Sequence, residues 1–372
     1  YATDADAGYY VNQTGQSIQT ACAIGTYQSA TGQTSCDNAD AGHYVDLGLG
    51  MGQSNQTACL AGTYNPNNGS TSPTDCVVAG AGHYVDPDLG PGQSNQTACL
   101  AGTYNPNTGS TRSVDCLESI VGYYVPISGQ SSQTPCLAGT YQATTGQSSC
   151  DDADAGHYVP TTGQSSQTEC AIGTYQVTTG QSSCDTAAAG YFVTSTAQTN
   201  QTACTIGTYQ SATGQTSCDN ADTGYYVPTT GQSSQTACLA GTYQVTTGQS
   251  SCDDADAGYY VSKTGQSSQI ACSRGTYQAD TGQTACDDAD VGYYVDQTGQ
   301  SSQTVCATWK STITTKSTSI LQCIADTDGD GVVDVIDTDD DDDNVLDVND
   351  AFPLDATESV DTDNDGTGDN AD

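Results

Sequence analysis

The chain has 372 residues, of which 35% are hydrophobic, and its 44 acidic and five basic residues give a formal net charge of −39. With two Phe and one Trp, it lacks the large apolar side chains that fill an ordinary domain core. The scarcity of Lys and Arg excludes nucleic acid and anionic membranes as partners and favours cations. No apolar run approaches the roughly 20 residues of a membrane span. The start at Tyr1, without Met or a signal peptide, indicates a mature product or a fragment.

A repeat occupies residues 8–323. Each of nine units begins with Gly followed by two aromatic residues, or by His and Tyr, at spacings of 34 or 40 residues. The units begin at Gly8, Gly42, Gly82, Gly122, Gly156, Gly190, Gly224, Gly258 and Gly292. Each unit has two related halves, and each half has the pattern of a short strand, a Thr-Gly turn and a second short strand. We predict an all-β, partly irregular fold over residues 1–324, an elongated disulfide-stapled repeat rod whose units touch mainly their neighbours.

Eighteen cysteines accompany the repeat, and no two lie closer than 14 positions. This spacing, with only three His, favours disulfides in an oxidising compartment over zinc sites. Pairing across the long gaps of 20 or 23 residues strands Cys22 and Cys323, whereas pairing across the short gaps of 14 or 17 uses every cysteine and is favoured. The short-gap pairs are Cys22–Cys36, Cys59–Cys76, Cys99–Cys116, Cys136–Cys150, Cys170–Cys184, Cys204–Cys218, Cys238–Cys252, Cys272–Cys286 and Cys306–Cys323.

The pattern Cys-x-x-Gly-Thr-Tyr…Gly-Gln-x-x-Cys resembles the cysteine-rich repeats of ephrin-receptor and tumour-necrosis-factor-receptor ectodomains over residues 8–323. The resemblance implies a bond between the Cys before Gly-Thr-Tyr and the Cys after the Gly-Gln turn, which is the short pairing. The chain departs from those families after Cys36, where Asp-Asn-Ala-Asp follows in place of a second nearby Cys.

Paired aromatic residues recur once per unit and admit two interpretations. They could form an exposed ladder that binds carbohydrate or another subunit, or one ring of each pair could pack over a disulfide as a small core; we favour the second. His43, His83 and His157 replace the first Tyr of a pair, and we expect them to be structural substitutions, since one His per unit does not assemble a metal site.

Acceptor sequences for N-linked sugar occur five times, which predicts covalent glycans in a secreted protein. They are at Asn12, Asn55, Asn68, Asn95 and Asn200. Three of them, Asn55, Asn95 and Asn200, stand at the same place in the unit, before Gln-Thr-Ala-Cys. Runs of Ser and Thr are additional candidates for O-linked sugar.

The composition changes after Cys323, because 19 of the 44 acidic residues lie in residues 326–372. Asp recurs at positions 1, 3, 5, 9 and 12 of three successive loops. The residues are Asp326, Asp328, Asp330, Asp334 and Asp337; Asp339, Asp341, Asp343, Asp347 and Asp350; and Asp361, Asp363, Asp365, Asp369 and Asp372. Position 6, where the loop turns sharply, is Gly331, Asn344 or Gly366. This spacing lets carboxylates converge on calcium, which takes 6–8 oxygen ligands.

Helical patterns do not flank these loops, so an EF-hand is not expected. The segment resembles thrombospondin type 3 repeats over residues 326–372, including the Asp-Ala-Phe-Pro-Leu-Asp linker at 350–355 that occurs in prokaryotic surface proteins. The resemblance implies that residues 325–372 form a separate segment wrapped around calcium ions. The alternative is a disordered acidic tail that only solubilises the protein. Since carboxylates without cations repel one another, we expect order in this segment to depend on calcium.

The sequence offers no nucleophile motif with a nearby His, and its cysteines are expected in disulfides, so we predict that the protein is not an enzyme. We expect an extracellular or cell-surface structural protein, part of a fibre, sheath or stalk, whose partners are copies of itself, calcium and glycans. Residues 369–372 repeat the Asp-Asn-Ala-Asp of 37–40, which suggests head-to-tail assembly. The alternative is an adhesin or receptor-like ectodomain that binds protein or glycan, with its site near the insertions at 47–52 and 65–75.

Overall fold

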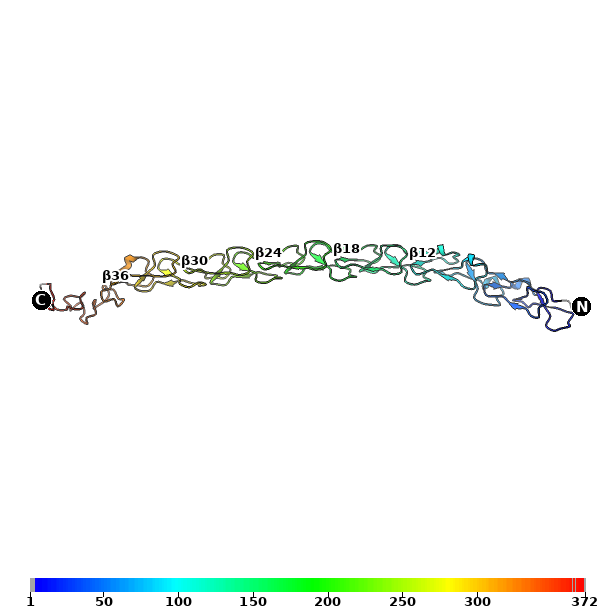
Figure 1. Cartoon of the computed structure of the whole chain (residues 1–372), viewed down its shortest axis with the longest axis horizontal. Coiled ribbons are helices and arrows are strands. Elements are labelled where there is room, and N and C mark those ends of the chain that lie inside the picture. The colour runs from blue at the N-terminus through cyan, green and yellow to red at the C-terminus, as the bar shows by residue number, and fades with distance from the viewer. Residues whose placement is uncertain (1–3, 363, 365, 371–372) are drawn as a thin grey trace. The chain divides into compact units, whose positions relative to one another are not determined.

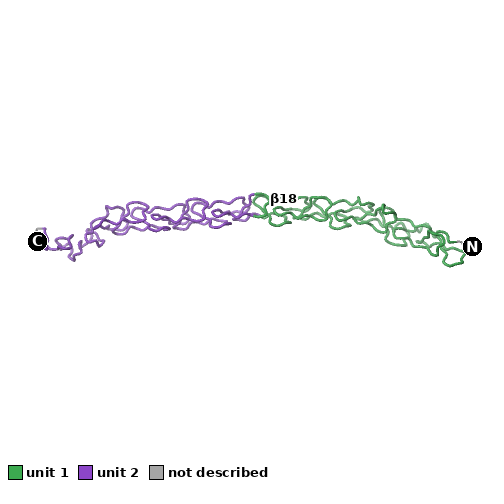
Figure 2. Tube along the Cα trace, viewed as in Figure 1, with its two compact units in different colours: residues 1–185, 195–200 green, residues 186–194, 201–372 purple. Residues whose placement is uncertain are grey.

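The computed structural model describes residues 4–362, 364 and 366–370. Throughout this part of the chain the regular structure is strands and short 3₁₀ helices, with no α-helix, which confirms the all-β prediction. Two compact units are distinguished (Figure 2). Unit 1 comprises the described part of residues 1–185 with 195–200, and unit 2 comprises 186–194 with the described part of 201–372. The boundary expected between residues 324 and 325 lies inside unit 2.

The strands are two residues long, except for the last two, which have three (Figure 1). Up to the sequence boundary of the units they are β1 (Tyr9–Tyr10), β2 (Thr20–Ala21), β3 (Thr26–Tyr27), β4 (Asp37–Asn38), β5 (His43–Tyr44), β6 (Thr57–Ala58), β7 (Thr63–Tyr64), β8 (Val77–Val78), β9 (His83–Tyr84), β10 (Thr97–Ala98), β11 (Thr103–Tyr104), β12 (Leu117–Glu118), β13 (Tyr123–Tyr124), β14 (Thr134–Pro135), β15 (Thr140–Tyr141), β16 (Asp151–Asp152), β17 (His157–Tyr158), β18 (Thr168–Glu169), β19 (Thr174–Tyr175) and β20 (Asp185–Thr186). The others are β21 (Tyr191–Phe192), β22 (Thr202–Ala203), β23 (Thr208–Tyr209), β24 (Asp219–Asn220), β25 (Tyr225–Tyr226), β26 (Thr236–Ala237), β27 (Thr242–Tyr243), β28 (Asp253–Asp254), β29 (Tyr259–Tyr260), β30 (Ile270–Ala271), β31 (Thr276–Tyr277), β32 (Asp287–Asp288), β33 (Tyr293–Tyr294), β34 (Thr304–Val305), β35 (Lys310–Thr312) and β36 (Cys323–Ala325). The 3₁₀ helices are η1 (Leu47–Leu49), η2 (Pro73–Asp75), η3 (Pro87–Leu89), η4 (Ser113–Asp115) and η5 (Ile320–Gln322).

Each half of a repeat is one antiparallel hairpin. The first strand pairs with the next strand in sequence, so that Tyr259 lies opposite Ala271 and Tyr260 opposite Ile270 in the hairpin β29–β30. A two-stranded hairpin of this size is not stable alone in water. Its stability therefore has to come from contacts with the hairpins that follow it.

Those contacts are backbone hydrogen bonds, and they join a hairpin both to the next hairpin and to the one after that. In the β29–β30 hairpin the amide of Gly258 donates to the carbonyl of Gln278 in the next hairpin, 2.7 Å away. The amide of Gly299, in the turn of the hairpin after that, donates to the carbonyl of Cys272 at 2.8 Å. Gly258 has φ +86°, and a Cβ there would overlap the carbonyl oxygen of Gly299. The repeated glycines are thus needed for close stacking as well as for turns.

From β3 to β34 the core is a column of small buried side chains, two from each hairpin. The residue after the first strand is Val in one half and Gln or Asn in the other, and the residue after the second strand is Cys in one half and Ala or Ser in the other. Val261, Cys272 and Ala289 are examples, each at most 1% exposed. Buried Gln278 is hydrogen-bonded, since its Nε2 donates to the Ala285 carbonyl and its Oε1 accepts from the Asp280 amide, both at 3.0 Å. Tyrosine is absent from the buried residues of the described chain.

The aromatic pairs are half-buried, and the first ring of a pair lies against a turn glycine two hairpins further along the chain. The Tyr259 hydroxyl is 3.5 Å from where a Cβ on Gly299 would lie, and the ring of His83 covers Gly129 in the same way. The Nδ1 of His43, His83 and His157 lies 3.2–3.4 Å from the carbonyl oxygen two residues earlier. The three His therefore occupy the place of the first Tyr in their units.

Nine disulfides join neighbouring hairpins, and no cysteine is free. Eight of them link the buried Cys after one hairpin to the Cys before the last strand of the next, as in Cys272–Cys286, and in the ninth Cys306 is joined to Cys323, the first residue of β36. All nine bridge the short gaps. Such a dense framework is typical of proteins in an oxidising, extracellular environment. No described helix has the length and apolarity to cross a bilayer.

Candidate metal sites in the acidic segment

The acidic segment starts directly from the last hairpin, β35–β36. Asp326 follows β36 at the place where other hairpins have their buried Ala. Its amide donates to the Trp309 carbonyl at 3.2 Å, as the amide of Ala289 does to the Gly275 carbonyl at 2.8 Å. Asp326 is also buried, with 4% exposure. The first predicted ligand therefore occupies a core position of the repeat.

The first loop gathers the residues at positions 1, 3 and 5. One carboxylate oxygen from each of Asp326, Asp328 and Asp330 lies within 4.8 Å of the other two. Hydrogen bonds from backbone amides to these side chains shape the turn that brings them together. Asp326 Oδ1 accepts from the Gly329 amide at 3.0 Å, and Asp330 Oδ1 accepts from the Val332 amide at 2.7 Å.

Positions 9 and 12 of this loop have different surroundings. Asp334 accepts from the amide and the hydroxyl of Thr327, at 2.8 and 2.9 Å, and thereby closes the loop. Asp337 Oδ1 accepts from the amides of Thr338 and Asp339, at 2.7 and 3.2 Å. Both carboxylates brace the loop in this structure, and neither belongs to the triad.

The second loop brings Asp339, Asp341 and Asp343 together within the same 4.8 Å. Asp341 is 7% exposed, and its Oδ2 has no hydrogen-bond partner, as is also true of Asp339 Oδ1 and Asp350 Oδ2. A buried carboxylate oxygen without a partner is costly, and a cation held among these atoms could supply the missing partner. Asp347, at position 9, accepts from the Asp340 amide at 2.9 Å and closes this loop.

The third loop is described in part, since Asp363, Asp365 and Asp372 lie outside the described residues. What is described repeats the others: Asp369 accepts from the Thr362 amide at 2.8 Å, and the Gly366 amide donates to Asp361 Oδ2 at 3.0 Å. The Oδ1 of Asp361 is buried without a partner. Position 6 has a positive φ in all three loops, at Gly331, Asn344 and Gly366.

Asp340 was not among the expected ligands, yet it is a notable group in the segment. It stands at position 2 of the middle loop, where the other loops have Thr327 and Thr362. A Thr hydroxyl donates to the position 9 carboxylate, but Asp340 places a second carboxylate there. Burial, and then the charge of Asp347, raise the pKa of Asp340 to about 6. Its Oδ1 is buried without a partner. The signal was hidden in sequence by the unbroken Asp run 339–343.

Mutual repulsion acts on the two triads as well. Desolvation by burial, and then neighbouring charges such as Asp328, raise the pKa of Asp326 despite hydrogen bonds from the backbone amides of Gly329 and Gly331. Desolvation also raises the pKa of Asp341, with Asp343 adding to it. The donors are all carboxylate oxygens, a set that suits hard divalent cations better than zinc or copper. The two described triads could each hold a metal ion.

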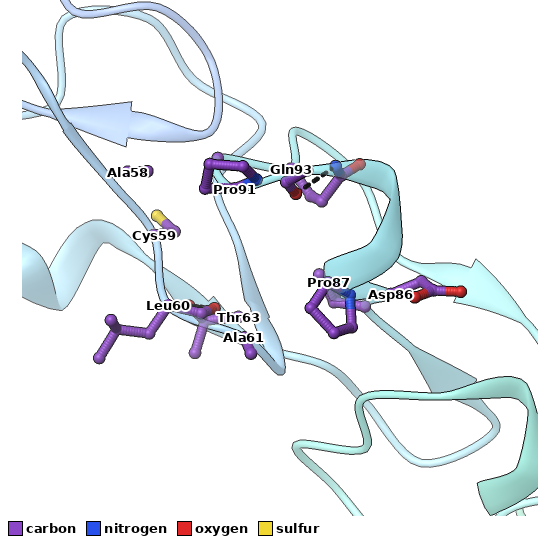
Figure 3. A pocket seen from close by; sticks show the side chains of 12 residues that line it. Ala58, Cys59, Leu60, Ala61, Thr63, Asp86, Pro87, Pro91 and Gln93 are labelled. Carbon is purple, nitrogen blue, oxygen red and sulfur yellow. Dashed lines mark hydrogen bonds between the residues drawn. The ribbon is translucent and has the colours of Figure 1, made fainter.

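A second feature is an apolar groove of about 350 Å³ in unit 1, at the insertion of the third repeat (Figure 3). Leu60 and Ala61 line one side and Pro87 and Pro91 the other. Its one carboxylate, Asp86, accepts from the Asp88 amide at 2.9 Å. The groove therefore has a surface for an apolar group and no pair of groups for acid–base chemistry.

The five predicted glycan acceptors are all exposed. They are Asn12, Asn55, Asn68, Asn95 and Asn200. Asn68 differs from the others, because its Oδ1 accepts from the Ala41 amide at 2.7 Å and the sequon residue Ser70 is 8% exposed. The remaining four stand on surface loops.

No protein-family model matches the chain, and no curated protein matches it. The fold and the acidic triads define a repeat protein of disulfide-stapled β-hairpins with an acidic candidate metal segment. The likeness to receptor ectodomains and to thrombospondin type 3 repeats rests on the motifs themselves.

Proposed function

We propose that the chain is a structural component of an extracellular or cell-surface fibre, sheath or stalk. Residues 1–324 form the stalk, and residues 325–372 form a calcium-binding end. The observation that carries the proposal is the uniformity of the junctions: Gly-to-Gly stacking recurs from hairpin to hairpin, as at Gly122 on Gly163 and Gly258 on Gly299. Identical junctions extend a structure without building a specialised site, which suits a mechanical role.

Calcium is the cation that fits the acidic segment best. The donors are hard oxygens, and the loop spacing provides several of the 6–8 ligands that calcium takes. The unpartnered oxygens of Asp339, Asp341 and Asp350 support the same assignment. Catalysis is not part of the proposal, and all eighteen cysteines are committed to disulfides.

Self-assembly and glycosylation complete the proposal. With a net charge of −39, copies of the chain repel one another unless cations bridge them, so calcium would also favour association. Sugar on the exposed acceptors, Asn55 and Asn95 among them, would shield strand edges from lateral aggregation. An intact mass equal to that of the bare polypeptide would remove the glycan part of the proposal.

Electron microscopy of the native, non-reduced protein before and after EDTA tests the structural role. We expect filaments or bundles that shorten or separate on chelation and re-form when calcium is restored. Magnesium at the same concentration is the matched control for simple charge screening. Single particles with the same association state in calcium and in EDTA would refute the polymer.

The groove beside Leu60 favours a second candidate function, an adhesin or receptor-like ectodomain. An apolar anchor of a protein or glycan partner would fill it, with Pro87 and Pro91 as rigid walls. A ligand screen with the native chain and with Leu60→Ser distinguishes the two functions. Ligand binding that the substitution abolishes would favour this candidate, and Leu239→Ser, at the corresponding exposed place of an ordinary repeat, is the control.

A further inference from the structure

The last hairpin breaks the repeat rule at Trp309. Within the stack this place is Gly, because a side chain there would collide with the turn of the hairpin two steps on. Trp309 keeps the left-handed backbone of that Gly, with φ +62°, but its hairpin β35–β36 is the last one among the described residues. Its ring instead lies against the first acidic loop, 3.8 Å from the position of a Cβ on Gly329. The tryptophan thus occurs where the stack ends and the loop begins.

Two hydrogen bonds also attach that loop to the hairpin. The Asp334 amide donates to the Ala325 carbonyl at 3.1 Å, and the Ser311 hydroxyl donates to the Gly331 carbonyl at 3.4 Å. Val333 is fully buried, the only such apolar side chain in the described acidic segment. Residues 326–337 therefore cover the end of the stack that a following hairpin covers elsewhere.

Asp326 belongs both to the core of the last hairpin and to the first acidic triad. It brings a carboxylate to a place where the other hairpins have an uncharged residue such as Ala255 or Ala289, each 0% exposed. No Lys or Arg pairs with it in the described chain, and its nearest charged partners are Asp328 and Asp330. Without a cation, the last hairpin contains a buried charge whose neighbours repel it.

We infer that the first acidic loop is the C-terminal cap of the hairpin stack, and that a divalent cation among Asp326, Asp328 and Asp330 locks it onto β35–β36. Cation occupancy thereby controls the order of the last hairpin as well as of the loop. The inference rests on the proposed calcium binding. It assigns to the first loop a role that the second loop does not share, since the hydrogen bonds of residues 339–347 in the described chain stay within residues 337–355.

Hydrogen exchange of the oxidised full chain, in calcium and in EDTA, tests the coupling. At free calcium about 100 times the dissociation constant, linkage predicts about 100-fold more protection of the amides in β35–β36. The hairpin β29–β30 is the internal control and should exchange at the same rate in both conditions. Calcium binding is measured separately by equilibrium dialysis.

Two variants make the test specific. Asp326→Ala restores the residue that the repeat uses at this place, so β35–β36 should form and exchange equally in calcium and EDTA. Asp341→Ala, the matched control, removes the buried ligand of the second loop and should leave the calcium response of β35–β36 unchanged.

The outcomes separate the two ideas. Calcium that binds without changing exchange in β35–β36 would overturn the coupling and leave the proposed binding intact, as would a full response retained by Asp326→Ala. No calcium binding by dialysis would overturn both.

Discussion

Neither the hairpin stack nor the acidic segment has a large hydrophobic core, and the two regions are stabilised in different ways. In the stack, backbone hydrogen bonds, disulfides and small buried residues such as Val261 and Ala255 hold each hairpin on the next two. In residues 326–370, Val333 is fully buried while other apolar side chains such as Val348 are largely exposed, the latter at 87%. The first region carries its stabilising contacts within the chain, and the second gathers carboxylates that could hold metal ions.

We therefore expect the two regions to lose their structure under different treatments. This is the largest effect that we predict. EDTA should open residues 326–370 and the last hairpin β35–β36 to proteolysis while the hairpins up to β34 stay intact, because the proposed calcium sites lie in the acidic segment. A reductant in the presence of calcium should open the hairpins first, since each disulfide contributes about 3 kcal/mol in the chain-entropy model. Limited proteolysis followed by mass spectrometry measures both. Resistance of the acidic segment in EDTA would contradict the comparison.

Gly258→Ala should damage the stack more than any change to a turn glycine. The new Cβ would meet the Gly299 carbonyl and would also have to adopt φ +86°. Overpacking and left-handed strain together suggest a loss of about 2–4 kcal/mol. The local unfolding free energy of β29–β30, from native-state hydrogen exchange, is the measurement.

Gly265→Ala is the matched control for that change. Gly265 also has a positive φ, +72°, but its Cβ would lie an ordinary 3.6 Å from the Tyr225 hydroxyl. Only the backbone strain remains, about 1 kcal/mol. Equal losses in the two variants would show that the close approach between glycines contributes nothing.

A smaller effect is expected from the Gln–Asp clamp that joins the ends of a hairpin. The Nε2 of Gln269 donates to Asp256 Oδ2, and its Oε1 accepts from the Asp256 amide, both at 2.6 Å. Gln269→Ala should cost about 1 kcal/mol in the exchange of β29–β30, because both bonds are exposed. Gln201→Ala is the control. Gln201 accepts from the amide of Ala188, which has no carboxylate to pair with it, so the loss of stability in its hairpin should be smaller. An equal cost at both positions would show that the side-chain bond to Asp256 is neutral.

Sequence reasoning reached the hairpins because their period and their Thr-Gly turns are local signals. The Asp spacing likewise predicted the two triads, whose members lie within five residues of one another. What it missed depends on contacts between distant residues. The stacking of Gly258 on Gly299 spans 41 positions, and a glycine in a turn motif gives no sign of what its Cα touches. The sequence predicted that Asp326 is a metal ligand. That it also occupies a core position of the last hairpin is evident only from the structure of β36.

The smallest effect, and the only stabilising one, is expected from a substitution of Ala197. Ala197 replaces the turn glycine of its hairpin with φ +57°, while its carbonyl still lies against Gly156 and its amide still donates to the Cys170 carbonyl at 2.9 Å. Ala197→Gly should remove left-handed strain but increase the freedom of the unfolded chain, so the net gain should be about 0.5 kcal/mol. Exchange of the Ala197 amide measures it, with Gly231→Ala as the reverse change in another hairpin. A loss of protection in Ala197→Gly would mean that the turn accepts a Cβ without strain, and the stack would then need glycine only where two hairpins meet.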